Sequence, residues 1–570
     1  MPKEEKRSCQ NCHGEFLIDA SDFEFYSKIK VPPPTFCPEC RFQRRLAWVN
    51  LRTLYKRPDI FDSKKALISM YAPDKPHVIW EDKKWWSDDF NPFSYGREYD
   101  FSAPFFAQFG ELLKNVPLPH LQRDYATGVN SEYCNGFSQL KNCYLAFAAD
   151  STEDSFYAYT VENLKDCCDI TFSTRNELCY EVMNVRDSNH ILFSHDCESC
   201  YDIMFCRDCT GCNNCFGCAN LTNKKYYIFN EPYSKEDYEK KIQEFKIGSY
   251  EALSGLHKQV SGHFVKYPYR AFHGRRNKDA RGDYVYNSKN AHDVYIVDGC
   301  EDVKHGHFLR SLGGTSGTTS SYDYSIFGVN ADLMYEAAWC GLGCSNVKCS
   351  LWNYGSRNLD YCIGCHNSSD LFGCIGVRKG QYCIFNKQYT KDEYGELREK
   401  IIQQMKNIQY KDSKARTYSY GDFFPIELSP FGYNETVAYN FSQRLSEKDA
   451  KSLGYNWEVF ESGKHGESSY AIPDSIGDVR DDIVDAVIAC IACEKNYRLI
   501  EPELNLYRRL GVPVPRKCHE CRFRERIGQL TPRKLFERSC AKCQANILTG
   551  FSPERPEIVY CEACYNSEVA

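Results

Sequence analysis

Residues 142–189 divide into blocks of twelve that read NCYLAFAADSTE (142–153), DSFYAYTVENLK (154–165), DCCDITFSTRNE (166–177) and LCYEVMNVRDSN (178–189). The second position of the four blocks is Cys143, Ser155, Cys167 and Cys179, and the fifth is Ala146, Ala158, Ile170 and Val182. Rungs continue in steps of 11 to 12 residues near Asn189, Cys200, Cys212 and Lys224. A short strand and a polar turn that repeat at such a period are typical of a solenoid.

This repeat predicts the fold class. Two rungs make about 23 residues, near one coil of a right-handed parallel β-helix. We therefore expect a mainly β protein with a central right-handed parallel β-helix (β-solenoid) in two duplicated halves, flanked by small four-cysteine zinc-binding domains. Small inward side chains suit such stacks, and Asn and Asp suit the turns between rungs. A long antiparallel meander is the competing fold.

A longer repeat encloses the short one. A shift of 156 residues carries Cys206, Cys209 and Cys218 onto Cys362, Cys365 and Cys374. The same shift carries the segment 226–238 onto 382–394, where Ser234 with Asp237 becomes Thr390 with Glu393. These pairs have the spacing of a helix N-cap, so a helix is expected to close each half.

Twelve of the 32 cysteines form three tetrads of paired CxxC motifs. The proposed zinc ligands are Cys9, Cys12, Cys37 and Cys40, then Cys490, Cys493, Cys518 and Cys521, then Cys540, Cys543, Cys561 and Cys564. Two-residue spacing lets both thiolates of a turn point at one ion, and two such turns complete a tetrahedral Zn²⁺ site. Four protein ligands close each site, so we expect three structural zinc ions. Redox motifs or free cysteines are the alternatives.

The first two tetrads are copies with 24 residues between their CxxC pairs. Phe16 matches Tyr497, Tyr26 matches Tyr507, Pro34 matches Pro515, and Arg41-Phe42 matches Arg522-Phe523. With Phe25-Tyr26, Pro34 and Cys37-Pro38-Glu39-Cys40-Arg41, the first copy resembles a family of small bacterial zinc domains of treble-clef or ribbon-like fold. The second copy departs from that pattern at His519, which replaces the proline.

The third tetrad has 17 residues between its pairs and resembles another small bacterial zinc module of the CxxC-(17)-CxxC type. Such modules are loosely associated with proteins that handle nucleic acid. Taken whole, the chain resembles bacterial multi-zinc proteins that join these modules to a Cys-rich repeat. That resemblance implies an architecture and no activity.

Composition limits the protein class. The chain has 570 residues and a net charge of −6, which gives no strong global field toward nucleic acid or a membrane. No apolar run reaches the length of a membrane span, and residues 1–10 lack the apolar stretch of a secretory signal. We therefore expect a cytoplasmic protein with no membrane partner. A chain of this length can bury a core without disulfide bonds.

The other 20 cysteines lie between Cys134 and Cys383 and follow the rungs. Their densest stretch is Cys197, Cys200, Cys206, Cys209, Cys212, Cys215 and Cys218. We interpret them as small buried side chains of the solenoid. An iron–sulfur cluster, a further zinc site or redox chemistry are the alternatives for the dense stretch.

Basic residues follow both copied tetrads: Arg41, Arg44 and Arg45 after the first, and Arg522, Arg524 and Arg526 after the second. On a helix, several would share one face and meet phosphate. A solvated helix that pairs with its own acids is the competing interpretation.

Residues 249–283 form a second basic region, in which Arg270, Arg275 and Arg276 alternate with aromatic residues. Basic residues between aromatics are typical of surfaces that bind single-stranded nucleic acid. A flexible solvated loop is the alternative.

The sequence predicts this order: 1–50 N-terminal four-cysteine zinc domain, 51–130 aromatic-rich capping segment, 131–248 first solenoid half with closing helix, 249–283 basic linker, 284–408 second solenoid half with closing helix, 409–485 linker region, 486–530 second four-cysteine zinc domain, 531–570 C-terminal zinc module.

The pattern favours a non-enzymatic, zinc-stabilised scaffold or binding protein whose partner is nucleic acid or a ribonucleoprotein. One alternative is a β-helix enzyme acting on a carbohydrate polymer, which would need a carboxylate pair or an Arg/Lys cluster on one solenoid face. Asp154, Asp166 and Asp187 are carboxylates of this kind, but their period explains them as turn residues. No catalytic residue is identified. The other alternative is a cysteine-rich redox or metal-binding protein.

Overall fold

A computed structural model describes residues 4–310, 317–460 and 468–569. Residues 311–316 of the second solenoid half and 461–467 of the linker region lie outside the described residues. The chain forms two compact units, one made of Met1–Leu121 with His273–Glu458 and the other of Gln122–Phe272 with Val459–Ala570. Each unit therefore draws on two separate stretches of the chain.

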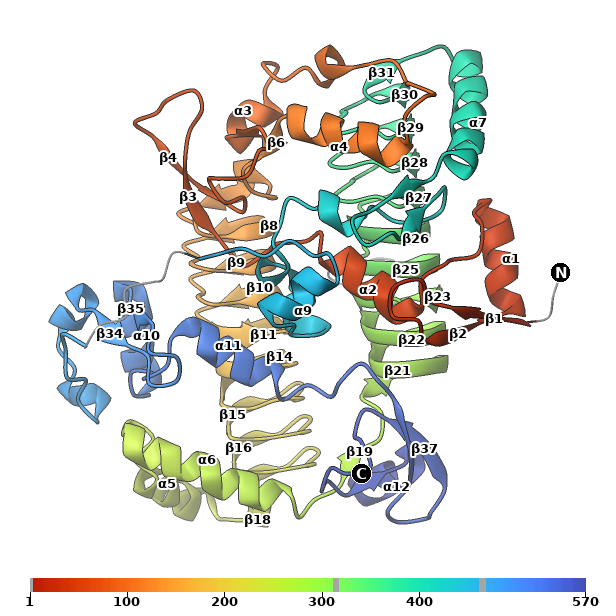
Figure 1. The fold of residues 1–570 in the computed structure, drawn as a ribbon. Helices are drawn as coiled ribbons and strands as arrows, with labels where there is room; N and C mark the ends of the chain where they lie inside the picture. The colour runs from red at the N-terminus through yellow and green to blue at the C-terminus, as the bar shows by residue number, and fades with distance from the viewer. Residues whose placement is uncertain (1–3, 311–316, 461–467, 570) are drawn as a thin grey trace. The chain divides into compact units, whose positions relative to one another are not determined.

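The unit Gln122–Phe272 with Val459–Ala570 contains the first solenoid half, drawn as the ladder from β8 to β18 in Figure 1. All neighbouring strands are parallel except the last pair, β17 and β18. The strands are β7 (Gly128–Val129), β8 (Asn135–Lys141), β9 (Phe147–Glu153), β10 (Tyr159–Lys165), β11 (Cys168–Thr171), β12 (Thr174–Glu177), β13 (Tyr180–Met183), β14 (Arg186–Leu192), β15 (Tyr201–Met204), β16 (Asn213–Phe216), β17 (Lys225–Ile228) and β18 (Glu231–Pro232).

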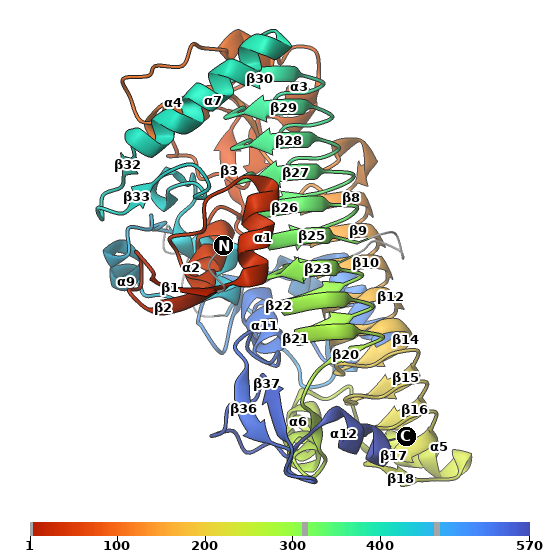
Figure 2. The ribbon, with the colours of Figure 1, turned by 90° about the vertical axis from the view of Figure 1, so that its right-hand side faces the viewer.

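The unit Met1–Leu121 with His273–Glu458 contains the second half, whose stacked rungs are clearest in Figure 2. Its last pair, β30 and β31, is again antiparallel. The strands are β20 (Gly274–Arg275), β21 (Lys278–Tyr286), β22 (Lys289–Asp298), β23 (Glu301–Lys304), β24 (His307–Leu309), β25 (Thr319–Phe327), β26 (Asp332–Cys340), β27 (Ser345–Lys348), β28 (Arg357–Asp360), β29 (Ser369–Phe372), β30 (Gln381–Ile384) and β31 (Lys387–Gln388).

One turn of the solenoid takes twelve residues. Cys168 pairs with Tyr180, and Tyr201 pairs with Asn213. Positive φ recurs at every third residue, as at Asn142, Leu145, Ala148 and Ser151, before Asp154 begins the next turn. A residue with positive φ bends the chain sharply, and we call such a residue a corner. Because a corner occurs every three residues, the chain closes one full turn within the twelve residues of a rung. The predicted coil of about 23 residues is therefore wrong, because each rung is a complete turn.

The residue after each corner is buried inside the turn, as Cys143, Ala146, Ala149 and Thr152 are. Serine and cysteine donate the same kind of hydrogen bond at these inward positions. The Ser155 hydroxyl donates to the Glu153 carbonyl (2.8 Å), and the Cys167 thiol donates to the Lys165 carbonyl (3.2 Å). Such bonds satisfy carbonyl groups that would otherwise be buried without a donor.

All 20 central cysteines are buried. Every cysteine from Cys134 to Cys218 except Cys168 belongs to the inner core of the first half. The predicted burial of these cysteines in the solenoid is confirmed.

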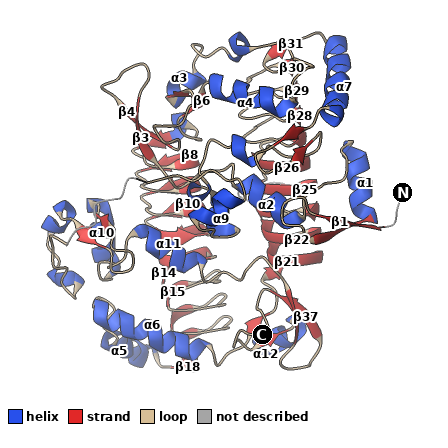
Figure 3. Ribbon diagram, viewed as in Figure 1, coloured by secondary structure: helices blue, strands red, loops and turns tan. Residues whose placement is uncertain are grey.

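Helices close both halves, as the sequence predicted (Figure 3). They are α5 (Lys235–Glu244) and α6 (Tyr250–Phe264) after the first half and α7 (Lys391–Asn407) after the second. The Ser234 hydroxyl accepts from the Asp237 backbone N–H (3.0 Å), and Thr390 forms a complete capping box with Glu393. The predicted fold class, a mainly β protein with a duplicated β-solenoid and small four-cysteine modules, is confirmed.

The segment after the first four-cysteine module packs on the last turns of the second half, within one unit. It comprises β3 (Tyr55–Pro58), β4 (Ala66–Ser69), β5 (Ile79–Trp80), α3 (Asp82–Trp86), α4 (Phe105–Asn115) and β6 (Leu118–Pro119). The Arg378 guanidinium donates to the carbonyls of Trp86 (2.8 Å) and Phe90 (2.8 Å). The Phe105 ring lies 5.2 Å from that of Phe385 in the last turn. These contacts cover apolar surface at the end of the solenoid.

The region after α7 packs against the first four-cysteine module: Gln10 Nε2 donates to the Thr417 carbonyl (3.0 Å), and Gln43 Nε2 to the Tyr433 hydroxyl (2.9 Å). Its elements are β32 (Tyr410–Lys411), β33 (Thr417–Tyr418), α8 (Val437–Phe441) and α9 (Glu447–Ser452). Short 3-10 helices are η1 (Pro92–Tyr95), η2 (Tyr125–Thr127), η3 (Ile426–Leu428), η4 (Tyr433–Glu435), η5 (Ile476–Asp478) and η6 (Asp481–Asp485). Among the described residues, no helix combines the length and apolarity that a membrane crossing requires.

Candidate metal centres

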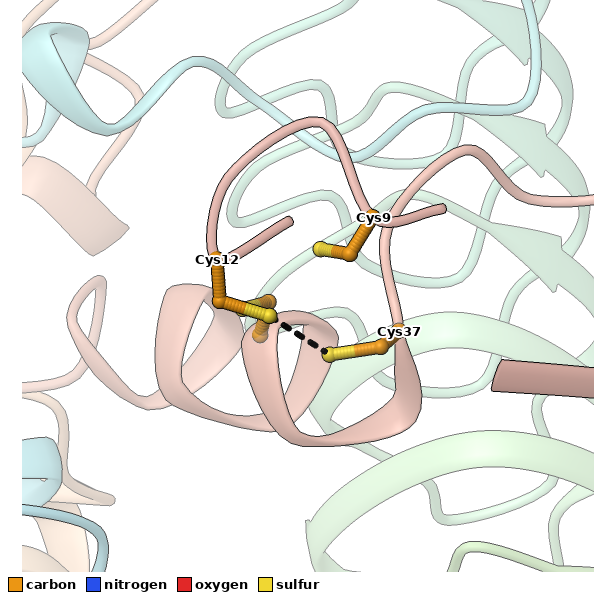
Figure 4. A group of neighbouring side chains, drawn as sticks. Cys9, Cys12 and Cys37 are labelled. Carbon is orange, nitrogen blue, oxygen red and sulfur yellow. Dashed lines mark hydrogen bonds between the residues drawn. The ribbon is translucent and has the colours of Figure 1, made fainter. Parts of the chain in front are cut away.

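The structure brings together the four sulfur atoms of each predicted tetrad. In each group all four Sγ atoms lie within 4.8 Å of one another. The groups are Cys9, Cys12, Cys37 and Cys40, then Cys490, Cys493, Cys518 and Cys521, then Cys540, Cys543, Cys561 and Cys564. In Figure 4, Cys12 and Cys37 point toward each other with a Sγ–Sγ distance of 3.7 Å. Each group can hold a metal ion.

All three centres share one construction, which begins with an antiparallel hairpin whose loop carries the first CxxC. The hairpins are β1 (Glu4–Ser8) with β2 (Glu15–Asp19), β34 (Ile488–Ala489) with β35 (Asn496–Tyr497), and β36 (Phe536–Ser539) with β37 (Asn546–Thr549). The residue after the second cysteine has positive φ at His13, Glu494 and Gln544. This left-handed residue folds the loop back, so both sulfurs face one point.

The second CxxC of each centre lies at the N-terminus of a helix. Cys37 is the N-cap of α2 (Pro38–Leu46), Cys518 is the N-cap of α11 (His519–Ile527), and Cys561 directly precedes α12 (Glu562–Val569). The positive end of a helix dipole favours thiolate over thiol. This position prepares the sulfurs to bind a cation.

Backbone N–H groups also stabilise the thiolates. The Cys518 N–H donates to Cys490 Sγ (3.2 Å), and the Cys561 N–H donates to Cys540 Sγ (3.2 Å). Burial alone would raise the pKa of Cys490, but hydrogen bonds from the backbone of Cys518, Ala492 and Cys493 outweigh it and lower that pKa to about 6. The thiolate is the form that binds metal.

The helix that carries Cys40 also fixes the N-terminal module to the second solenoid half. Arg41 pairs with Asp323 (2.7 Å), Arg45 with Glu336 (2.8 Å), and Arg44 with Glu336 (3.1 Å). Arg45 and Asp323 have no solvent exposure. Because the three cations and two carboxylates are buried together, the contact is specific as well as charged.

The second copy forms the equivalent contact with the first solenoid half. Arg522 Nε donates to Asp169 Oδ2 (2.7 Å), and Arg526 Nη1 lies 2.8 Å from Asp169 Oδ1. The Tyr157 hydroxyl of the solenoid donates to Glu503 (2.8 Å) on α10 (Glu501–Leu510), and the Tyr507 hydroxyl donates to the same carboxylate. We call each set of buried arginines and solenoid carboxylates a clamp.

The two clamps correspond at two of their arginines, whereas Arg44 falls on Glu525 and has no counterpart. A shift of 481 carries Arg41 onto Arg522 and Arg45 onto Arg526. Arg41 donates to the Phe36 carbonyl (2.6 Å) and Arg522 to the Lys517 carbonyl (2.7 Å), again at equivalent positions. The N-terminal module therefore holds the second half, and the second module holds the first half.

The buried charges of each clamp shift the pKa values of its carboxylates. Burial alone would raise the pKa of Asp169 and of Asp323, but the arginines of each clamp outweigh it and lower both pKa values. Glu181, twelve residues after Asp169, differs: burial and then repulsion from Asp169 raise its pKa to about 7. The clamp on the first half thus lies beside one carboxylate that changes its charge near pH 7.

The third module joins its unit differently, through a strand. β38 (Val559–Tyr560) pairs in parallel with β19 (Tyr269–Arg270) of the basic linker. Arg270 pairs with Asp208 (3.1 Å) of the first solenoid half and lies 4.6 Å from the Tyr565 ring centroid. Arg270 is therefore engaged inside its own unit.

The predicted phosphate-binding arginines fall into two groups. Arg41, Arg44, Arg45, Arg522 and Arg526 are buried, so their guanidinium groups are occupied within the protein. Arg524 is partly exposed and donates to Cys521 Sγ (3.3 Å), and Arg275 is half-buried 5.8 Å from the Tyr286 ring centroid. Arg276 is exposed. Burial corrects the solvated-helix interpretation for the five buried arginines, whereas Arg524 lies 4.0 Å from Glu520 of its own helix, as that interpretation expects.

The solenoid carboxylates Asp169, Glu181, Asp323 and Glu336 were missed from the sequence. A signal was present for Asp169 and Glu181. They occupy one column of positions twelve residues apart, in which Tyr157 comes before them and Phe193 after them. A carboxylate in an apolar column needs a buried cation as partner.

Comparison with models of known protein families gave no match to this chain, and a search of curated proteins found no significant similarity. Functional inference therefore rests on the geometry of the metal centres and clamps.

Proposed function

We propose that the protein is a zinc-stabilised scaffold in which two four-cysteine modules clamp the two halves of a β-solenoid. The observation that carries the proposal is the repeated coupling of a four-cysteine group to a buried arginine clamp on the same helix, α2 or α11. A metal that orders the start of this helix also positions the arginines.

The donor set supports Zn²⁺ as the ion. Four thiolates around one point are the ligands of structural zinc, and a site closed by four protein ligands keeps no position for substrate. A small module also gains folding free energy from the metal, because the free energy of binding becomes free energy of folding when the ligands come together only in the folded state. Zinc would act here by ordering the hairpin and helix of each module.

Elemental analysis of the purified full chain tests this proposal. We expect about three zinc ions per chain, one for each group of four sulfurs. Cys12→Ser, Cys493→Ser and Cys543→Ser should each lose about one zinc. Cys179→Ser is the matched control, since an inward serine keeps the donor and leaves the tetrads intact. Iron in place of zinc, or full zinc content in all three ligand variants, would contradict the proposal.

We propose nucleic acid as the partner class because basic residues gather at one exposed place of the second half. Arg275, Arg276 and Lys278 lie within four residues at the start of the second half, Arg276 and Lys278 are exposed, and Arg275 lies against Tyr286. Cations beside an aromatic ring suit single-stranded RNA or DNA.

A filter-binding assay with single-stranded RNA and DNA across a salt series tests this partner. Affinity should fall as salt rises, because phosphate contacts release counterions. Arg276→Glu with Lys278→Glu should weaken binding, whereas Lys240→Glu on the exposed side of α5 should not. Absent binding at low salt, or equal binding by both variants, would exclude nucleic acid at this surface.

A further inference from the structure

Thiols fill the interior of the last turns of the first solenoid half. The inward residues from 197 to 218 are Cys197, Cys200, Ile203, Cys206, Cys209, Cys212, Cys215 and Cys218. The turn 206–217 has cysteine at every inward position, and no thiol of the stretch is more than 3% exposed. We call the seven cysteines the thiol column.

Packing alone does not require these cysteines. Earlier turns of the same half fill inward positions with residues such as Ala146, Ala158, Ile170 and Val182. The equivalent turn of the second half contains Cys362, Cys365, Ser368 and Leu371, all buried in the same fold. Since the solenoid accepts serine and leucine here, the concentration of thiols points to their chemistry.

The thiols of the column are neighbours, because inward positions lie three residues apart within a turn and twelve residues apart between paired turns. Cys212 interacts with Cys200, Cys209 and Cys215. Cys206 interacts with Cys209 and Cys218, and Cys197 with Cys209. Each thiol also donates to a backbone carbonyl, as Cys206 does to Met204 (3.3 Å). A chain of adjacent sulfurs in an apolar interior is a donor set for a soft cation.

The distances between the sulfur atoms limit which soft cation the column can bind. Among the described residues, only the three CxxC tetrads bring three or more sulfurs within 4.8 Å of one another, so the column does not match a tetrahedral Zn²⁺ site. Cu(I) is softer than Zn²⁺ and accepts low coordination numbers, including pairs of bridging thiolates.

We propose that the thiol column, centred on Cys206, Cys209, Cys212 and Cys215, binds Cu(I). Each bound ion replaces the S–H protons of its ligating thiols, which pass to solvent, and neither copper nor sulfur changes oxidation state. The next turn has Leu221, Lys224 and Tyr227 at its inward positions. Lys224 is exposed, so the turn that follows the column has one inward-phase side chain in solvent.

The test uses the zinc-loaded full chain under anaerobic conditions, with Cu(I) added as its acetonitrile complex. After gel filtration we expect about one or more copper ions per chain with zinc content unchanged, and thiolate-to-copper charge-transfer absorption in the ultraviolet. The double variant Cys212→Ser with Cys215→Leu has the residues of the equivalent turn in the second half. It should retain at most about one tenth of the copper bound by the natural chain. Cys167→Ser with Cys179→Ser, outside the column, should retain it fully.

Circular dichroism and zinc content establish that the variants are folded. Where the double variant does not fold, Cys209→Ser replaces it, because a serine keeps a donor at the same position. Copper gained only in exchange for lost zinc, or equal copper retention by the column variants and the control, would overturn the proposal. Its failure leaves the zinc-scaffold proposal intact, since that rests on separate cysteines.

Discussion

At the scale of single residues, the buried arginines distinguish this protein from a chain of independent zinc modules. Arg522 and Arg526 share Asp169 without solvent exposure of the carboxylate. Removing one partner of a buried pair leaves charges that neither water nor protein compensates. Surface pairs of the same solenoid lack this property, because water replaces the lost partner.

Asp169→Asn should therefore destabilise the second module and its contact with the solenoid by about 3 kcal/mol. The matched control is Asp187→Asn, which removes an exposed partner of Arg175 on the same solenoid and should cost about 0–1 kcal/mol. Hydrogen exchange of α11 and β11 measures both effects. Equal effects of the two substitutions would mean that the clamp does not hold the module.

Glu181 makes the contact pH-dependent. Its pKa rises from the usual value near 4.5 to about 7 in the folded protein. An acid with a raised folded pKa contributes stability that is complete below its unfolded pKa and is lost as pH rises through the folded value. Protection of α11 should therefore fall between about pH 5 and pH 7.

Glu181→Gln should remove that dependence. At pH 8 the variant should be more stable than the natural chain by about 1–2 kcal/mol, a value reduced because the side chain is only half-buried. At pH 5 the two should be similar. Exchange rates of α11 measured at both pH values check this, and a natural chain with pH-independent protection would show that Glu181 does not titrate in this range.

At the scale of elements, the sequence predicted the period of the solenoid but not its corners. Cys143, Ser155, Cys167 and Cys179 mark the rung, because the same inward position is occupied by a small side chain in four successive turns. The corners include Leu145, Tyr157 and Phe193, whose residue types disfavour positive φ. Hydrogen bonding between turns overrides this local preference, so propensity could not reveal that one rung is one turn.

The inward position of Cys179 should tolerate serine and reject a larger residue. Cys179→Ser keeps a donor for the Glu177 carbonyl and should cost less than about 1 kcal/mol. Cys179→Leu adds atoms to a close-packed interior and should cost about 1–3 kcal/mol. Hydrogen exchange of β13 measures both, and a leucine variant as stable as the serine variant would contradict a tightly filled turn.

The candidate sites were predicted unevenly for a related reason. The ligands of each tetrad lie within one short segment, so their spacing identified all twelve cysteines. The clamp partners are remote, since Arg41 meets Asp323 and Arg522 meets Asp169. Because that distance hides the partners, the sequence offered only phosphate or the acids of the same helix as counter-charges for the arginines.

At the scale of the whole molecule, the chain alternates between its two units. The N-terminal module, the second half and the segment to Glu458 form one unit, and the first half with the last two modules forms the other. Each solenoid half is therefore stabilised by a module from a distant part of the chain. Loss of metal from either module should therefore destabilise strands that are far from that module in sequence.

Hydrogen exchange of the full chain before and after zinc removal tests whether the modules stabilise the solenoid. We expect a chelator to raise exchange in α2 and α11 and also in the strands beneath them, β25 and β26 in one unit and β11 and β13 in the other. β16 and β29, which lie away from these helices, should keep their protection. Unchanged protection of β11, β13, β25 and β26 in the metal-free protein would show that the modules do not stabilise the solenoid.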